Sequence, residues 1–234
     1  IKYQKQYLKN PRECDKKTIN FIKKNLNSRN CKIADIGSGN GNFLFLLKKK
    51  IPLQKYYGFE YSQEMLNKCK SEEHLKGIYF DKINILKTQI KPMMDVIVST
   101  AVTYQFEEAE FIKCMENIYK SLSKNGTYIG YELINEFNQE ITVIEKTELY
   151  KTGIPLHIRS QNFLQKVCKK IGFQEIKFNF FNINIDLKSK KKINKISEEY
   201  VEHLKTYTIK DQKKKRHMFR GSIYEPWCHI ICKK

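Results

Sequence analysis

The sequence lacks a long apolar run: the longest uninterrupted apolar stretch among its 234 residues is Phe43–Leu47. A membrane-spanning helix needs about 20 such residues, and we therefore expect no membrane partner. The chain also does not open with a basic segment followed by an apolar one, so no signal peptide is expected. These two absences favour a cytoplasmic protein.

Signals for metals and disulfides are also missing. The seven cysteines are scattered, and none stands in a C-x-x-C pair or at a Cys/His spacing typical of a metal site. An odd number of cysteines cannot pair completely, and reduced core thiols are the simpler interpretation. We expect no bound metal.

Arginine is also scarce in this sequence. The formal net charge is +19, yet only five of the 44 basic residues are arginine. Arginine is the side chain that hydrogen-bonds bases and phosphates in bidentate fashion, so nucleic acid is not the expected partner. A solvated lysine surface and an acidic small-molecule partner both stay open. Hydrophobic residues make up 41% of the chain, which is enough for a sizeable core.

What the sequence does contain is an alternation of strand and helix patterns. Such an alternation predicts an α/β fold, with a parallel sheet and helices on both of its faces. Ser62 is placed to begin one of these helices. The expected strands are 31–36, 56–60, 77–81, 95–99 and 127–133, and the other helices are 12–28, 43–50 and 107–122.

The second half is less regular. Helices are expected at 138–150 and 160–171, followed by strands at 173–181 and 223–232. Between these two strands lies a basic segment, at about 186–218, that encloses a helical stretch near 194–205. We expect this insertion to form a helical and basic cap, because excursions of this length are often functional.

The most specific motif is Asp35-Ile36-Gly37-Ser38-Gly39-Asn40-Gly41, which lies between a strand and a helix. Glycines there allow a tight turn and a close approach to a ligand, and the amides at the start of the helix are hydrogen-bond donors. A dinucleotide site would need G-x-G-x-x-G, but the sixth position is Asn42.

The spacing acid-x-G-x-G-x-G resembles that of the class I S-adenosylmethionine-dependent methyltransferases. Glu60 matches the acid that closes the second strand in this family and accepts hydrogen bonds from ribose hydroxyls. The family's polar residue beside the adenine falls on Asp81 or Asn84, and we favour Asn84. The strand 95–99, the turn 124–127 and Gly172-Phe173 also match. The resemblance covers about residues 31–183 and resumes near 219–232.

The resemblance implies a Rossmann-like, seven-stranded, mostly parallel sheet and S-adenosyl-L-methionine as the cofactor. It implies one methyltransferase domain over 1–234, with an N-terminal helix or lid (1–30), a cofactor-binding core (31–135) and a substrate-side half (136–234). The cofactor-binding residues that it implies are Asp35, Gly37, Ser38, Gly39, Gly41, Glu60, Tyr61, Asn84, Ile85 and Ser99.

The segment Ser99–Tyr104 favours a small-molecule acceptor. Enzymes that methylate exocyclic base nitrogens carry an Asn/Asp-Pro-Pro-aromatic tetrad here, and this segment has no proline. The C-terminal half is similar to that of a group of largely uncharacterised bacterial small-molecule methyltransferases. An RNA methyltransferase and a non-catalytic nucleotide-binding protein remain as alternatives, and the oligomeric state is left open.

The basic cap segment suggests an anionic acceptor, such as a phosphorylated or nucleotide-linked metabolite of surface-polysaccharide or secondary metabolism. A hydroxyl or ammonium acceptor would need a general base, for which the candidates are His157, Tyr104 and Glu132. An anionic oxygen would need none. The candidate substrate-binding residues are Tyr104, His157, Arg159, Tyr207, Arg220 and Trp227.

Overall fold

The computed structural model describes residues 8, 10–26, 30–146, 148, 151–183, 206–210, 216–220 and 225–234. The chain divides into two compact units. The first unit comprises residues 1–183 and 226–234. The second comprises residues 184–225.

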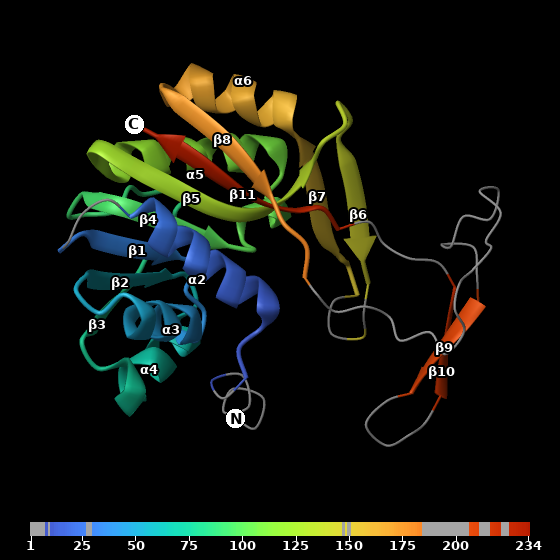
Figure 1. Ribbon diagram of the computed structural model, residues 1–234, viewed down its shortest axis with the longest axis horizontal. Helices are drawn as coiled ribbons and strands as arrows, with labels where there is room; N and C mark the ends of the chain where they lie inside the picture. Colours follow the sequence, from blue (N-terminus) through green and yellow to red (C-terminus); the bar gives the residue numbers. More distant parts are fainter. Residues whose placement is uncertain are drawn as a thin grey trace. The chain divides into compact units, whose positions relative to one another are not determined.

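Among the described residues, a nine-stranded sheet forms the centre of the first unit, and seven of its strands form one continuous series (Figure 1). Its strand order is β3 (Ile78–Lys82), β2 (Lys55–Glu60), β1 (Lys32–Ile36), β4 (Met94–Thr100), β5 (Leu122–Asn135), β11 (Trp227–Lys233) and β8 (Glu175–Phe180). The first five strands pair in parallel, whereas β11 is antiparallel to both of its neighbours. The predicted mostly parallel, seven-stranded sheet is confirmed.

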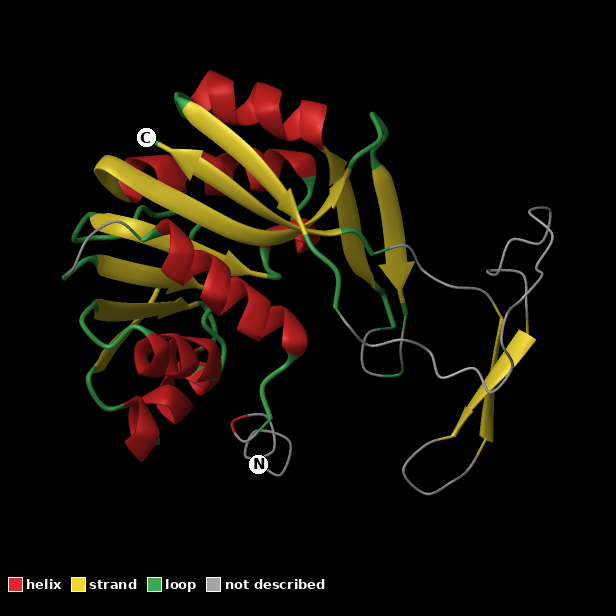
Figure 2. Cartoon of the chain, viewed as in Figure 1, coloured by secondary structure: helices red, strands yellow, loops and turns green. Residues whose placement is uncertain are grey.

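Helices cover both faces of this sheet (Figure 2). Side chains alternate along each strand, so Ile33 of β1 packs into one core and Ala34 into the other. The core that contains Ile33 is covered by α2 (Glu13–Asn25), α3 (Asn42–Lys50) and α4 (Gln63–Ser71), and the other core by α5 (Glu108–Ser121) and α6 (Gln161–Ile171).

The helices also begin and end largely where the sequence predicts. The hydroxyl of Ser62 accepts a hydrogen bond from the amide of Met65 and begins α4. Gly172 ends α6 in the left-handed conformation, with φ of +119°. Two short 3-10 helices, η1 (Glu73–Leu75) and η2 (Thr103–Gln105), complete the helical elements described.

The predicted helix at 138–150 is wrong. Residues Ile141–Glu145 form strand β6, which pairs antiparallel with β7 (Ile154–Ser160). The run Ile-Thr-Val-Ile at 141–144 is entirely β-branched, and such side chains favour strands over helices. Strand β7 in turn pairs with the end of β5 through Ile134 and Arg159, so this hairpin continues from the main sheet.

Of the second unit, the structure describes two strands, β9 (Thr206–Lys210) and β10 (Arg216–Arg220), which pair antiparallel. Two of the predicted substrate residues, Tyr207 and Arg220, belong to these strands. The predicted helical stretch near 194–205 lies outside the described residues.

All seven cysteines are free thiols. Within the described ranges, none of the helices combines the length and the apolar character needed to cross a bilayer.

Candidate active site

A glycine loop connects the carboxyl end of β1 to α3. Its three glycines, Gly37, Gly39 and Gly41, have positive φ angles of 67°, 52° and 74°, which L side chains adopt only with strain. A Cβ atom on Gly37 would also lie 2.7 Å from Cγ2 of Val102. The loop therefore requires glycine at this position both for its backbone and for its contact with the turn after β4.

Glu60, at the end of β2, binds this loop. Its Oε2 accepts a hydrogen bond of 2.8 Å from the amide of Gly39, and its Oε1 accepts from the amides of Tyr61 (2.7 Å) and Ser62 (2.9 Å). The carboxylate is thus held by three backbone N–H groups beside the glycine loop, and Oε2 retains a lone pair for a further donor.

Two buried polar side chains beside the loop have no hydrogen-bond partner among the described residues. These are the carboxyl group of Asp35 and the hydroxyl of Ser38, which are 1% and 6% exposed. Burial raises the pKa of Asp35 well above its ordinary value, and the nearby carboxylates of Glu60 and Asp15 raise it further. An unpartnered buried carboxyl group of this kind favours a cationic ligand group.

A cavity of about 290 Å³ opens beside the glycine loop and Glu60. It brings together five of the predicted cofactor residues, Gly37, Glu60, Tyr61, Asn84 and Ile85. Sequence reasoning missed the others, which are apolar and carry no motif. The remaining lining residues are Ile36, Phe59, Ile83, Leu86, Val102 and Phe106.

The structure places Asn84, and not Asp81, at this cavity. Oδ1 of Asn84 accepts a hydrogen bond of 3.0 Å from the amide of Leu86, which fixes its side chain at the start of a turn. Asp81 is exposed on β3, where its carboxylate accepts from the hydroxyl of Tyr79 and the amide of Lys82.

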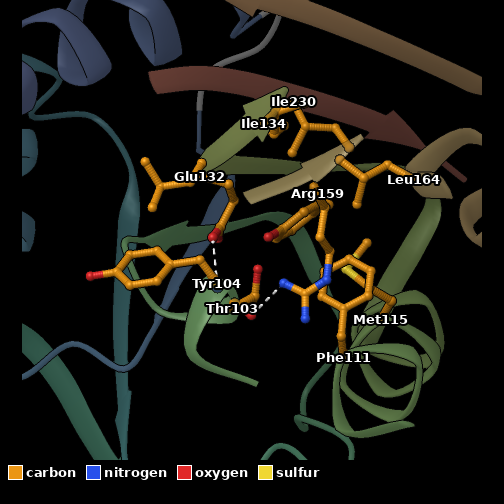
Figure 3. Close-up of a pocket in the computed structure, with 11 residues that line it drawn as sticks. Thr103, Tyr104, Phe111, Met115, Glu132, Ile134, Arg159, Leu164 and Ile230 are labelled. Carbon is orange, nitrogen blue, oxygen red and sulfur yellow. Dashed lines mark hydrogen bonds between the residues drawn. The ribbon is translucent and has the colours of Figure 1, made fainter. Parts of the chain in front are cut away.

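Residues 101–106 form a turn after β4 that borders the cavity on its other side. Behind this turn lie Glu132 and Arg159, which are 5% and 6% exposed (Figure 3). Burial raises the pKa of Glu132 to about 7, against the opposing effects of the charge on Arg159 and of the hydrogen bond from Ser99. Neither charged group lines the cavity.

Ser99, another predicted cofactor residue, is fully buried at the end of β4. Its hydroxyl donates a hydrogen bond of 3.2 Å to Oε1 of Glu132. Like Glu132 and Arg159, it does not line the cavity.

Three neighbouring aromatic rings lie at the same end of the sheet, where the parallel strands have their carboxyl ends. The ring of Tyr104, in the turn, is 6.2 Å from that of Trp227 at the start of β11, and Trp227 is 4.5 Å from Tyr131 on β5. Because β11 runs antiparallel to β5, its first residue stands at the carboxyl ends of the parallel strands. Tyr104 and Trp227 are both half-buried.

The structure does not place His157 with these residues. It lies on β7, where Nδ1 is 3.0 Å from the hydroxyl of Thr142 and Nε2 is 3.6 Å from Oε1 of Glu107. Among the described side chains, no group of three or more His, Cys, Asp or Glu residues is arranged to hold a metal ion.

Comparison with known proteins shows which family the chain resembles. A family model described as a methyltransferase domain matches residues 27–199. The chain is 25% identical over 140 residues to carboxy-S-adenosyl-L-methionine synthase of Nautilia profundicola, which covers 55% of this chain and 59% of that protein. It is 24% identical over 144 residues to malonyl-[acyl-carrier protein] O-methyltransferase of Bacillus anthracis, over 59% and 53% of the two chains. The chain thus spans little more than half the length of these curated relatives.

Solved structures share the fold. A possible histamine N-methyltransferase of Thermotoga maritima covers 100% of this chain and 95% of its own length, at 16% identity and a TM-score of 0.53. An O-methyltransferase from a Brevibacillus brevis polyketide synthase, solved with S-adenosyl-L-homocysteine, covers 70% of this chain and 54% of its own length, at 17% identity and a TM-score of 0.53.

The family match covers well over half of the chain and coincides with the sheet, the glycine loop and Glu60. The chain therefore belongs to the class I S-adenosylmethionine-dependent methyltransferases, with S-adenosylmethionine as its cofactor.

Proposed function

We propose that the cofactor binds in the cavity between the glycine loop and the turn at 101–106. Three features of the chain fit it. The Oε2 atom of Glu60 has a lone pair for ribose hydroxyls, and Asn84 offers an amide beside apolar side chains for the adenine. The unpartnered Asp35 does not itself line the cavity, but it precedes the lining residues Ile36 and Gly37 and would neutralise a nearby cationic group. The predicted residues Ser38, Gly39 and Gly41 would contribute through the loop.

We further propose that the domain methylates an O or N atom of a small acceptor bound beside Tyr104 and Trp227. The observation that carries this proposal is the position of Tyr104. It lies between Val102 and Phe106, the two turn residues that line the cavity, and its ring faces Trp227 at the carboxyl ends of the strands. A small molecule held by these two rings would approach the cofactor cavity from the carboxyl ends of the strands.

The bound cofactor supplies an activated methyl group, so the chain's own task is mainly to align the acceptor and to exclude water. Tyr104 and Trp227 would hold the acceptor. Among the three candidates for a general base, only Tyr104 belongs to this aromatic pair. Glu132 is enclosed behind the turn, and His157 faces Thr142 and Glu107.

The proposal that the acceptor is anionic has two supports. Residues 188–216 contain eleven Lys or Arg against four Asp or Glu, and a basic surface attracts anions. One curated relative is named for O-methylation of a malonyl group, whose free carboxylate is itself an anionic oxygen. An oxygen that is already ionised needs no general base.

The test is formation of S-adenosylhomocysteine with a panel of acceptors: small carboxylates, phosphomonoesters, nucleotide-linked sugars, neutral alcohols and amines, and RNA. We expect turnover with an anionic small molecule, and loss of most of it in Trp227→Ala. A neutral amine as the best substrate would overturn the anionic proposal. Turnover of RNA with steep salt dependence would overturn the small-molecule proposal altogether.

A further inference from the structure

The turn at 101–106 is held from behind by a buried pair of opposite charges that does not line the cofactor cavity. We propose that Glu132 and Arg159 are positioning residues, which fix this turn in the shape that completes the cofactor cavity and orients Tyr104. The inference rests on the proposed cofactor site, and it assigns to the two residues a role other than general base and substrate ligand.

Glu132 accepts a hydrogen bond from a backbone amide of the turn. Its Oε2 accepts a hydrogen bond of 3.1 Å from the backbone N–H of Tyr104, and its Oε1 accepts from the hydroxyl of Ser99 at the end of β4. One carboxylate therefore connects the last part of the strand to the 3-10 turn that follows it (Figure 3).

Arg159 donates hydrogen bonds to two backbone carbonyl groups of the turn. Its Nη1 donates a hydrogen bond of 3.2 Å to the carbonyl oxygen of Thr103, and its Nη2 donates to the carbonyl oxygen of Phe106. The guanidinium group also lies 4.3 Å from the ring centre of Phe111 on α5. A planar, multiply donating group is suited to binding two carbonyl groups of one turn at once.

The other side of the turn contacts the cofactor cavity. Val102 and Phe106 line that cavity, Val102 packs against Gly37 of the glycine loop, and the ring of Tyr104 faces Trp227. Each of these three side chains is within one residue of a backbone group that Glu132 or Arg159 binds. A displacement of the pair would consequently move both walls of the proposed site.

The chemistry of the turn explains why charged groups stand here. Ala101 has a φ of +58°, and its amide still donates to the carbonyl oxygen of Tyr131 on β5. The chain then leaves the sheet, so the amide and carbonyl groups of the residues that follow lose their strand partners. Buried backbone groups need hydrogen bonds, which apolar side chains cannot provide. The pair comes from two adjacent strands, since Arg159 on β7 is paired with Ile134, two residues beyond Glu132 on β5.

The experiment compares stability with cofactor affinity in four variants: Arg159→Met, Glu132→Leu, the double variant and Ile118→Ala. Thermal unfolding gives the stability. Calorimetry with S-adenosylhomocysteine gives the affinity, at a temperature at which every variant is folded. Ile118 is a fully buried residue near the C-terminal end of α5. Just after this helix, Leu122 pairs with Met94, the first residue of β4, whereas the turn follows the last residue of β4. Its truncation destabilises the core without touching the turn.

We expect both single variants to unfold at lower temperature and to bind about tenfold more weakly. The double variant should recover neither the stability nor the affinity, because its apolar side chains leave the backbone groups of the turn without these hydrogen bonds. Ile118→Ala should lose stability and bind like the parent. The emission of Trp227, the only tryptophan of the chain, should shift in the single and double variants and not in Ile118→Ala.

Parental affinity in the double variant, or an equal loss of affinity in Ile118→Ala, would overturn the inference and leave a purely structural role. Absence of S-adenosylhomocysteine binding in the folded parent would instead overturn the proposed cofactor site, and the inference with it.

Discussion

The carboxylate of Glu60 accepts a hydrogen bond from the amide of Gly39, 21 residues earlier in the chain, and thereby joins the end of β2 to the glycine loop after β1. The same carboxylate accepts from the amides of Tyr61 and Ser62. The partners of this carboxylate are all hydrogen-bond donors, so a side chain that itself donates a hydrogen bond would not fit in its place.

This arrangement predicts that Glu60→Gln is not a conservative change. The NH₂ group of glutamine would face at least one of the three backbone N–H groups, because neither oxygen of Glu60 is without such a donor. We expect about tenfold weaker binding of S-adenosylmethionine, measured by calorimetry. Glu64→Gln, on the exposed surface of α4, is the matched control and should bind like the parent. Equal affinity in the two variants would contradict the prediction.

Two glycines of the loop should respond differently to alanine. Both Gly37 and Gly39 have positive φ, so each substitution should cost about 1–2 kcal/mol of unfolding free energy from backbone strain. A Cβ on Gly37 also meets Val102 at 2.7 Å, whereas one on Gly39 meets only the carbonyl of Gly37 at 4.0 Å. Chemical denaturation should therefore show the larger loss for Gly37→Ala. A larger loss for Gly39→Ala would argue against this loop geometry.

Cofactor binding should strengthen as the pH rises. The pKa of Asp35 is raised in the free protein, and a bound cationic group would favour the ionised carboxylate, so binding should release a proton. Calorimetry in buffers of different ionisation enthalpy measures that proton. Asp35→Asn should abolish the pH dependence, and the exposed Asp81→Asn should retain it. A pH dependence that persists in Asp35→Asn would exclude Asp35 as the coupled group.

His229 should make the fold less stable in acid. Its ring is stacked between Phe21 and Phe181, and burial lowers its pKa to about 4. Between about pH 6.5 and pH 4 the unfolded chain binds a proton that the folded chain does not, so stability falls as the pH falls, by up to about 3 kcal/mol. His229→Phe should show a shallower decline in denaturation experiments over that range. Parallel curves for the variant and the parent would refute the assignment.

The glycine loop, Glu60 and the succession of strands and helices around them could be predicted because local sequence determines them. Three glycines at alternate positions after an apolar strand specify a backbone that few other residues can adopt. Apolar runs of five or six residues between helical patterns specify buried parallel strands. In the same way, the position of Ser62 before a helical segment was sufficient to predict where α4 begins.

The rest depended on distant partners. Residues 141–145 form a strand because residues 154–158 pair with them, and the helical prediction gave too little weight to four consecutive β-branched residues. Arg159 is buried because the carbonyl groups that it binds come from a turn more than 50 residues earlier. A charged residue is predicted at the surface unless its partners are known, and the motif gave no indication of them.

The second unit enters and leaves the sheet at a single place. Strands β8 and β11 are neighbours, and the amide of Phe181 donates to the carbonyl oxygen of Trp227 just beside the two points where the chain departs and returns. In topological terms, residues 184–225 are the enlarged tip of a β-hairpin. The entropic cost of closing such a loop grows only slowly with its length. This segment can therefore lengthen, shorten or be exchanged without changing the pairing of β8 with β11.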